Sequence, residues 1–258
     1  MNPFEVTDRI ILVTGGTRGL GRAISFQLAR SGAQIIAGYF QNETAAESFR
    51  RESAAEGLHC EAVKANLMAA TGIQTLADHL ISRYPRLDAL IYNSATGVHK
   101  PLDELTQRHL LGVWQVNVGA FFELCLKLRS RFSTGSRIIA ISSEGAHRAV
   151  QRYGSVGTSK AALEALCRQM AAEWMPSGIS VNVVAPGLLV TDTLKTWADA
   201  DARMRLESQL SPLGRLVRLE EVANLVHFLC SQASEGIVGQ TIVVDGGKCV
   251  SSHATPGI

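Results

Sequence analysis

Long runs of like charge are absent from this sequence of 258 residues. Lys and Arg together number 25 and Asp and Glu 23, which leaves a formal net charge of +2 at neutral pH. A surface that binds nucleic acid or an anionic membrane usually needs a concentrated block of basic residues. We therefore expect neither as a partner, and the sequence favours a small-molecule ligand.

Paired cysteines and closely spaced histidines are also absent. The five cysteines form an odd set without a C-x-x-C pair, and the seven histidines show no H-x-x-x-H spacing. These absences argue against a disulfide framework and a zinc site. We expect reduced thiols, no metal ion and a cytoplasmic location.

The sequence shows neither a signal-peptide pattern nor a long apolar run. The opening stretch MNPFEVTDRIILVTGG carries charges within its first nine residues and reaches a glycine turn soon afterwards. No uninterrupted apolar stretch attains the roughly 18 residues that a membrane span needs. We expect no cleaved leader and no membrane span.

Short β-branched runs alternate with longer segments of helical period, and hydrophobic residues make up 46% of the chain. This alternation is typical of βαβ units around a parallel sheet. We predict one α/β domain over residues 1–258: a Rossmann-type, doubly wound parallel sheet of about seven strands with helices on both faces. The predicted strands are Arg9–Thr14, Gln34–Tyr39, His59–Ala65, Ala89–Asn93, Arg137–Ser142, Ser180–Ala185 and Thr241–Asp245. The predicted helices are Arg18–Ser31, Ala45–Glu56, Thr71–Tyr84, a long Leu110–Phe132, Tyr153–Met175 and Leu219–Ser231. Residues 188–213 have weak periodicity and are predicted to form a lid over the ligand crevice.

The first predicted strand leads directly into GGTRGLGR and then an amphipathic helix. Gly15, Gly19 and Gly21 would allow a tight turn and a close backbone approach, and the helix amino terminus would face a pyrophosphate. The spacing G-x-x-x-G-x-G differs from the commonest dinucleotide fingerprint, and an ordinary strand-to-helix turn is the alternative. We predict a dinucleotide site that also includes Thr17, Arg18 and Leu20.

The end of the second predicted strand indicates which nicotinamide cofactor binds. An NAD enzyme usually places Asp or Glu there, but this chain reads AGYFQN, with Tyr39 and no carboxylate from Gly38 to Asn42. Arg18 could supply a cation to a 2′-phosphate, although it could also be an ordinary surface charge. We predict NADPH as the cofactor.

Further motifs follow along nearly the whole chain: ANL at 65–67, NSA at 93–95, Asn117 in QVNVGAFF, ISS at 141–143, Tyr153 with Lys160, APGLLVT at 185–191 and GQTIVVDGG near the end. With TGGTRGLG, they make the chain resemble a short-chain dehydrogenase/reductase. The resemblance implies that the ends of successive strands contact the cofactor, with ordinary turn chemistry as the alternative at each position. The residues implied are Asn66, Leu67, Asn93, Ser94, Ala95, Pro186, Gly187, Leu189 and Thr191.

The spacing of Tyr153 and Lys160 departs from the usual family signature, in which three residues separate the two. Six residues separate them here, and Val156 stands four before the lysine. On a helix this displaces the tyrosine by one turn while keeping the same face. In reduction of an α,β-unsaturated thioester, hydride adds at the β-carbon and charge develops on a carbonyl oxygen three bonds away, so a more distant acid fits. The segment resembles the NADPH-dependent enoyl-acyl-carrier-protein reductases of the enoyl reductase III type.

The resemblance implies a role for each catalytic residue. Tyr153 would stabilise and protonate the enolate, while Lys160 would hold the cofactor ribose and lower the pKa of the tyrosine. Ser143 would either bond the substrate or only line the cavity, and Asn117 would organise backbone or water near Lys160.

Two other functions stay open at this point. One is a reductase of 3-oxoacyl thioesters or other ketones, and the other is a cofactor-binding regulatory member with little turnover. The substrate carrier would be acyl carrier protein or coenzyme A. We also expect a homotetramer that assembles through the helices at 110–132 and 153–175, because their apolar period exceeds what one sheet face covers.

Overall fold

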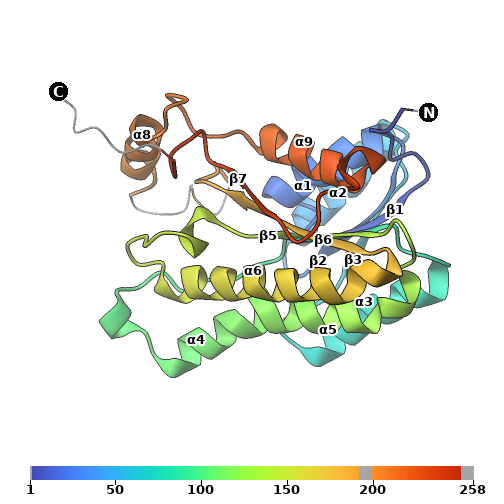
Figure 1. The fold of residues 1–258 in the computed structure, drawn as a ribbon, viewed down its shortest axis with the longest axis horizontal. Helices are drawn as coiled ribbons and strands as arrows, with labels where there is room; N and C mark the ends of the chain where they lie inside the picture. The colour runs from blue at the N-terminus through green and yellow to red at the C-terminus, as the bar shows by residue number, and fades with distance from the viewer. Residues whose placement is uncertain (1, 192–193, 195–198, 251–258) are drawn as a thin grey trace.

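The computed structural model describes residues 2–191, 194 and 199–250. Its centre is a parallel sheet in the order β3-β2-β1-β4-β5-β6-β7, which confirms the predicted fold class (Figure 1). The strands are β1 Ile10–Thr14, β2 Gln34–Tyr39, β3 Cys60–Lys64, β4 Ala89–Tyr92, β5 Arg137–Ile141, β6 Ser180–Pro186 and β7 Thr241–Val244. Strands β1, β4, β5 and β6 are buried along their whole length, as expected for a sheet covered on both faces.

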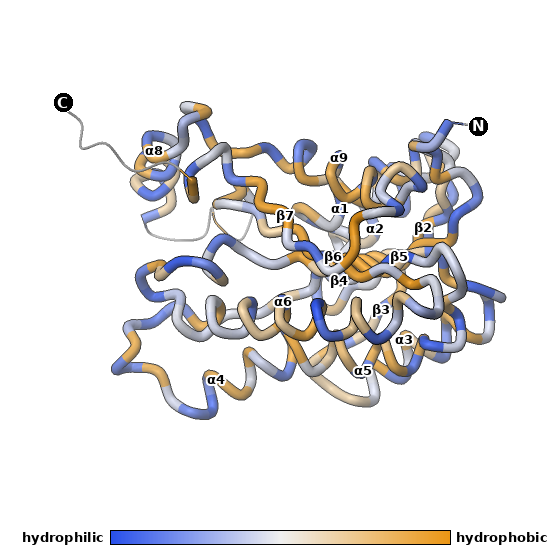
Figure 2. Tube along the Cα trace, in the orientation of Figure 1, coloured by the Kyte–Doolittle hydropathy of each residue, from blue (hydrophilic) through white to orange (hydrophobic). Residues whose placement is uncertain are grey.

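Helices cover both faces of this sheet (Figure 1). One layer holds α1 Gly19–Arg30, α2 Glu43–Ala55 and α9 Leu219–Cys230, and the other holds α3 Ala70–Arg83, α4 Gln107–Trp114, α5 Ala120–Lys127 and α6 Gly154–Trp174. Each layer encloses its own hydrophobic core against the sheet. Figure 2 shows hydrophobic residues concentrated in the central strands and hydrophilic residues in the surrounding loops.

The strand order reverses at the centre of the sheet. The chain runs outward from β1 through β2 to β3 and then returns to place β4 on the other side of β1. The crossover connections therefore diverge between β1 and β4 and leave a crevice at the carboxyl ends of these strands. A ligand site is expected at that point.

The helix predicted at 110–132 is less regular than its sequence suggests. It begins earlier, at Gln107, where Thr106 and His109 form a capping box, and it contains a π-helical segment, η2 Gln115–Gly119, between α4 and α5. A separate 3-10 turn at Arg129–Arg131 follows. A π segment inserts one residue into a helix and releases a backbone carbonyl, and such segments are frequent at functional sites.

The span Gln107–Lys127 is the one helix among the described residues that is long and apolar enough to cross a membrane. The sequence pattern predicts no membrane span. The side of the helix that carries Phe121, Leu124 and Cys125 packs into the core beside the sheet. This packing is typical of an amphipathic core helix.

The segment predicted as a lid contains α8, Ala200–Leu210. Residues 192–193 and 195–198, including Trp197, lie outside the described residues. The helix contacts loops that follow other strands: Glu207 meets Lys248 after β7, and Arg203 lies close enough to His99 to lower the pKa of that imidazole, which burial lowers most. The lid itself stays a prediction.

Candidate active site

A cavity of about 1050 Å³ opens at the carboxyl ends of β1 to β5. It brings together most of the site residues predicted from the sequence. The predicted residues that line it are Gly15, Thr17, Arg18, Gly19, Leu20, Tyr39, Asn66, Leu67, Asn93, Ser94, Ala95, Tyr153, Lys160 and Thr191. Its volume and its position at the reversal of strand order suit a dinucleotide and a small substrate.

The loop between β1 and α1 requires glycine at Gly15 and Gly21. A Cβ on Gly21 would stand 2.0 Å from the carbonyl oxygen of Gly15, and Gly15 itself has a φ of +63°. No side chain caps the first turn of α1, whose N-cap residue is Arg18. Its backbone N–H groups therefore stay available to an anion at the cavity wall, which fits a pyrophosphate.

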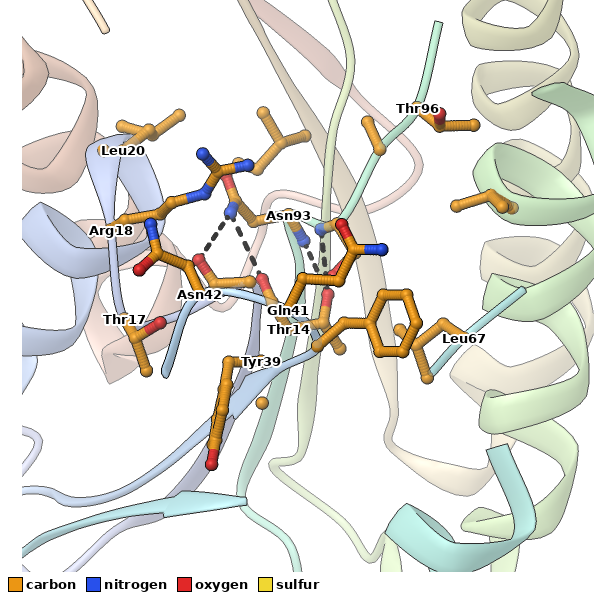
Figure 3. Close-up of a pocket in the computed structure, with 18 of the residues that line it drawn as sticks. Thr14, Thr17, Arg18, Leu20, Tyr39, Gln41, Asn42, Leu67, Asn93 and Thr96 are labelled. Atoms are coloured by element: carbon orange, nitrogen blue, oxygen red, sulfur yellow. Dashed lines mark hydrogen bonds between the residues drawn. The ribbon is translucent and has the colours of Figure 1, made fainter. Parts of the chain in front are cut away.

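Asn93 holds this loop in place (Figure 3). Its amide nitrogen donates to the carbonyl oxygens of Thr14 and Gly15, each at 3.2 Å, and the backbone N–H groups of Asn93 and Ser94 donate to the Thr14 hydroxyl at 3.0 Å. The ends of β1 and β4 are thereby tied together. Asn93 contributes to the site chiefly by fixing the backbone that would cradle the cofactor.

The rim beside β2 carries the features relevant to cofactor choice. Arg18 and Asn42 both line the cavity there (Figure 3), and within the described part of the chain the Arg18 guanidinium makes no hydrogen bond or ion pair. The hydroxyl of Tyr39 instead donates to Glu43 at 2.7 Å. Tyr39 thus reaches the cavity without offering its hydroxyl to it.

Glu43 lines the same rim, one residue beyond the stretch from Gly38 to Asn42 in which the sequence shows no carboxylate. Its carboxylate accepts bonds from Tyr39 and from Lys64 at 3.1 Å, and it lies 3.7 Å from Arg50. The bonds from Tyr39 and Lys64 hold its pKa below the ordinary value. Because two cations neutralise this carboxylate, it does not oppose a 2′-phosphate as a lone acid would.

Phe40 and Met68 are further cavity residues that no motif singled out. They are 39% and 58% exposed; Phe40 directly follows β2, and Met68 lies four residues after the end of β3. Exposed apolar side chains on a cavity rim suit the flat face of an aromatic ring. Their positions shortly after strand ends are the feature of the sequence that could have predicted them as cavity residues.

Other strand-end residues show turn chemistry. The Asn66 side chain accepts a bond from the backbone N–H of Met68 at 3.0 Å, and Thr191 accepts one from Leu194 at 3.3 Å. Pro186, Gly187 and Leu189 do not line the cavity: Pro186 ends β6 beside β7, Gly187 packs on Asp245, and Leu189 packs on the core beside α1 and α9. Gly21 likewise lies behind the loop instead of on the cavity surface.

Tyr153 and Lys160 line the inner end of the cavity. Tyr153 is the N-cap residue of α6 and has non-helical backbone angles, so the helical spacing to Lys160 does not determine where its ring lies. Its hydroxyl lies 3.3 Å from Ser143 Oγ. Burial raises the pKa of Tyr153, which keeps the phenol protonated and able to act as an acid.

The Lys160 ammonium is buried and donates to the carbonyl oxygen of Ile141 at 2.7 Å. Burial lowers its pKa to about 8. Val156, at the position where the family signature has tyrosine, is buried on the cavity wall against Gly97. No acid stands four residues before the lysine, and the phenol reaches the cavity from outside the helix.

Asn117 lies within the π segment and is fully buried. Its amide group exchanges two hydrogen bonds with the backbone of Thr96, at 2.9 and 3.0 Å, and donates to Ser159 Oγ at 2.8 Å. Thr96 lines the cavity. Asn117 therefore holds the backbone of Thr96, which follows β4, and bonds Ser159, the residue before Lys160. It lies behind the cavity wall and does not reach the cavity itself.

One group of possible metal ligands occurs among the described residues. Glu144, Asp245 and Cys249 bring their ligand atoms within 4.8 Å of one another. The ammonium of Lys248 lies 2.6 Å from the Glu144 carboxylate and already compensates its charge. None of the three residues lines the cavity that contains Tyr153 and Lys160.

Comparisons with known proteins agree with this arrangement. Residues 15–248 match the model of a family described as enoyl-(acyl carrier protein) reductase. The 1-cyclohexenylcarbonyl-CoA reductase of Streptomyces collinus is 33% identical, over 95% of this chain and 89% of that protein. The hydroxynaphthalene reductase-like protein of Metarhizium robertsii is 30% identical, over 95% and 97% of the two chains.

Solved structures extend the likeness to cofactor complexes. The Pseudomonas aeruginosa RhlG/NADP active-site complex is 32% identical with a TM-score of 0.89, over 96% of this chain and 99% of that one. A gluconate 5-dehydrogenase from Burkholderia cenocepacia in complex with NADP and tartrate is 27% identical with a TM-score of 0.87, over 97% and 98%. The chain therefore belongs to the short-chain dehydrogenase/reductase superfamily and is an oxidoreductase with a cofactor of the NADPH type.

Proposed function

We propose that the protein reduces the carbon–carbon double bond of a 2-enoyl thioester. The observation that carries this proposal is the place of the acid. Tyr153 enters the cavity from the loop before α6, whereas the wall four residues before Lys160 is the apolar Val156. The family description and the relative that is an enoyl-CoA-type reductase support the same reaction class.

Tyr153, Ser143 and Lys160 would each have a separate role in this reduction. NADPH supplies a hydride when bound. The protonated Tyr153 donates a hydrogen bond to the thioester carbonyl oxygen and stabilises the charge that develops there. Ser143 fixes the phenol through the 3.3 Å contact, and Lys160, whose ammonium is held by the Ile141 carbonyl oxygen, would bind the cofactor ribose.

A ketone reductase is the second candidate, and one observation favours it. Ser143 and Tyr153 are paired, so a serine and a tyrosine stand together as they would around a single carbonyl oxygen. The gluconate dehydrogenase and hydroxynaphthalene reductase-like relatives belong to the same superfamily. The substrate of this candidate would be a 3-oxoacyl thioester.

The test is a comparison of kcat/KM for a 2-enoyl and a 3-oxoacyl thioester of equal chain length, followed through NADPH consumption. We expect the enoyl compound to be consumed faster, on coenzyme A or acyl carrier protein. A ratio that favours the 3-oxo compound would establish the ketone reductase instead. Cofactor binding without turnover of either would indicate a regulatory member of the family.

Arg18 is expected to give NADPH an advantage over NADH. One charge-assisted bond to a 2′-phosphate is worth roughly 1.5–3 kcal/mol, so NADPH should bind at least about tenfold more tightly. Arg18→Ala should remove most of this preference, whereas Arg51→Ala, an exposed arginine on α2 away from the cavity, should leave it intact. Titration of cofactor fluorescence measures both affinities, and equal values in the unchanged protein would overturn the assignment.

We also propose a homotetramer. Leu163, Met170 and Ala171 of the apolar pattern in α6 are used by the core, but Ala161 and Ala165 are exposed. Beyond α6, the helix Gln107–Lys127 exposes an apolar stripe at helical spacing, made of Leu111, Trp114, Phe122 and Leu126 at 41–61% exposure. Exposed apolar surface of this kind commonly marks an interface.

Light scattering should therefore give four times the 27.7 kDa chain mass. Trp114→Asp should lower the mass by placing a charge in the stripe. A monomer mass for the unchanged protein would refute the tetramer.

The cytoplasmic location stays a prediction.

A further inference from the structure

The ring of Tyr153 is positioned by neighbours outside its own helix. A Cβ on Gly145 would lie 2.5 and 2.6 Å from two ring carbons of Tyr153, so the ring packs directly on the Gly145 backbone. His99, from the segment after β4, contacts the ring at 5.6 Å between centroids. Because Tyr153 precedes the first turn of α6, its ring position depends on these contacts and not on the helix alone.

Gly145 lies in the short turn η4, Glu144–Ala146, directly after Ser143. Glu144 is buried at 6% exposure and pairs with Lys248 at 2.6 Å. The Lys248 side chain is 2% exposed and also pairs with Glu207 of α8. A buried lysine from the segment after β7 thus joins the turn behind the catalytic tyrosine to the helix of the predicted lid.

We propose that Lys248 is a positioning residue for the catalytic tyrosine, acting through the buried Glu144–Lys248–Glu207 triad. Three elements that are distant in sequence converge on one ammonium, and one of them carries Ser143 and Gly145. Loss of the ammonium would leave two neighbouring carboxylates in a largely buried place, and their repulsion would displace η4 and α8. The triad therefore links the geometry of the acid to that of the lid helix.

The triad also has an electrostatic effect on Tyr153. Burial raises the pKa of the phenol, the bond from Ser143 lowers it, and the negative charge of Glu144 raises it further. Lys248 opposes that last contribution by pairing with Glu144. Among the described residues, the titratable groups nearest Tyr153 are Glu144 and His99, and Lys160 lines the same cavity. Those nearest Lys248 in the same part of the chain are Glu144, Glu207 and Asp245. Cys249 lies beside Asp245, and Arg203 beside His99.

The test compares Lys248→Met, Glu144→Gln and the double variant. If Tyr153 is the acid, kcat falls at high pH as its phenol ionises. Lys248→Met should lower kcat about tenfold, leave KM for NADPH within about twofold, and move this basic limb up by roughly half a pH unit or more, because Glu144 is no longer compensated. Glu144→Gln should move it down, and the double variant should lie between the two.

A second measurement keeps the inference separate from the proposed function. Ultraviolet absorbance of tyrosinate, compared with and without Tyr153→Phe, gives the ionisation of Tyr153 with no substrate present. The pKa of Tyr153 measured in this way should shift in the same directions as the high-pH fall of kcat, whichever thioester the enzyme reduces.

Lys248→Arg should restore most of kcat, since it keeps a cation between the carboxylates. Lys127→Met is the matched control, because Lys127 pairs with Glu123 and Gln74 on the outside of α5. An ionisation of Tyr153 that is the same in all variants, or equal shifts in Lys248→Met and Glu144→Gln, would overturn the proposal. A kcat of Lys248→Met equal to that of the unchanged enzyme would do so as well.

Discussion

Replacing Tyr153 with Phe should lower kcat for a 2-enoyl thioester by roughly 10²–10⁴, the usual range for loss of a general acid. The ring of Phe keeps the packing on Gly145 and His99, and only the hydroxyl beside Ser143 is lost. The glycine loop that would cradle the cofactor pyrophosphate lies at the β1 end of the cavity. NADPH affinity should therefore stay within about twofold, since no phosphate contact changes.

Steady-state kinetics and a fluorescence titration with NADPH measure the two effects separately. Tyr84→Phe is the matched control, because the Tyr84 hydroxyl donates to Glu61 at 2.8 Å outside the cavity. That variant should turn over at the rate of the unchanged enzyme. A Tyr153→Phe enzyme that keeps most of its kcat would show that another group protonates the product.

The sequence predicts the sheet well because most strands are short, apolar and bounded by turn residues. The strands predicted at 9–14 and 34–39 differ from β1 and β2 by at most one residue. The order of motifs then locates the cavity, since carboxyl ends of parallel strands meet at one edge of a sheet. Residues placed just after strands, such as Ser94 and Leu67, line the cavity as predicted.

Contacts between distant segments could not be predicted in the same way. Glu43 looks like an unfavourable acid until Lys64, at the end of β3, is seen beside it, with Arg50 of the same helix nearby. The pairing of Lys248 with Glu144 spans 104 residues and has no periodic signature.

The backbone conformation near the catalytic residues could not be predicted from the sequence either. A π segment depends on which carbonyl accepts each hydrogen bond, and at η2 the Tyr92 hydroxyl donates to the Val116 carbonyl oxygen at 2.5 Å. Helical spacing placed Tyr153 on the face of Lys160, whereas its N-cap backbone puts the ring against η4. In both places tertiary contacts decide the local geometry.

Lys160→Met is expected to stabilise the protein while it impairs function. Burial lowers the pKa of Lys160 from 10.5 to about 8, a difference that corresponds to roughly 3 kcal/mol of cost for keeping the ammonium inside. Methionine has a similar shape and no charge. It loses the bond to the Ile141 carbonyl oxygen, worth about 1 kcal/mol, so the net gain in unfolding free energy should be about 2 kcal/mol at pH 7.

The stability gain of Lys160→Met should depend on pH. Between about pH 8 and 10.5 the unfolded chain holds the Lys160 proton and the folded chain releases it, so the stability of the unchanged protein rises with pH in that window. The advantage of Lys160→Met should therefore be complete below pH 8 and disappear as the pH approaches 10.5. Urea unfolding of the cofactor-free protein at several pH values measures it, with Lys127→Met as a partly exposed control.

Turnover and NADPH affinity should both fall in Lys160→Met, because the same ammonium would serve the cofactor ribose and the phenol of Tyr153. A stable but inactive variant would mean that the lysine is retained at a cost in folding for its chemistry, as is common at active sites. A variant less stable than the unchanged protein at pH 7 would instead show that the Ile141 carbonyl compensates the buried charge fully. The lysine would then be part of the structural core of the site as much as of its chemistry.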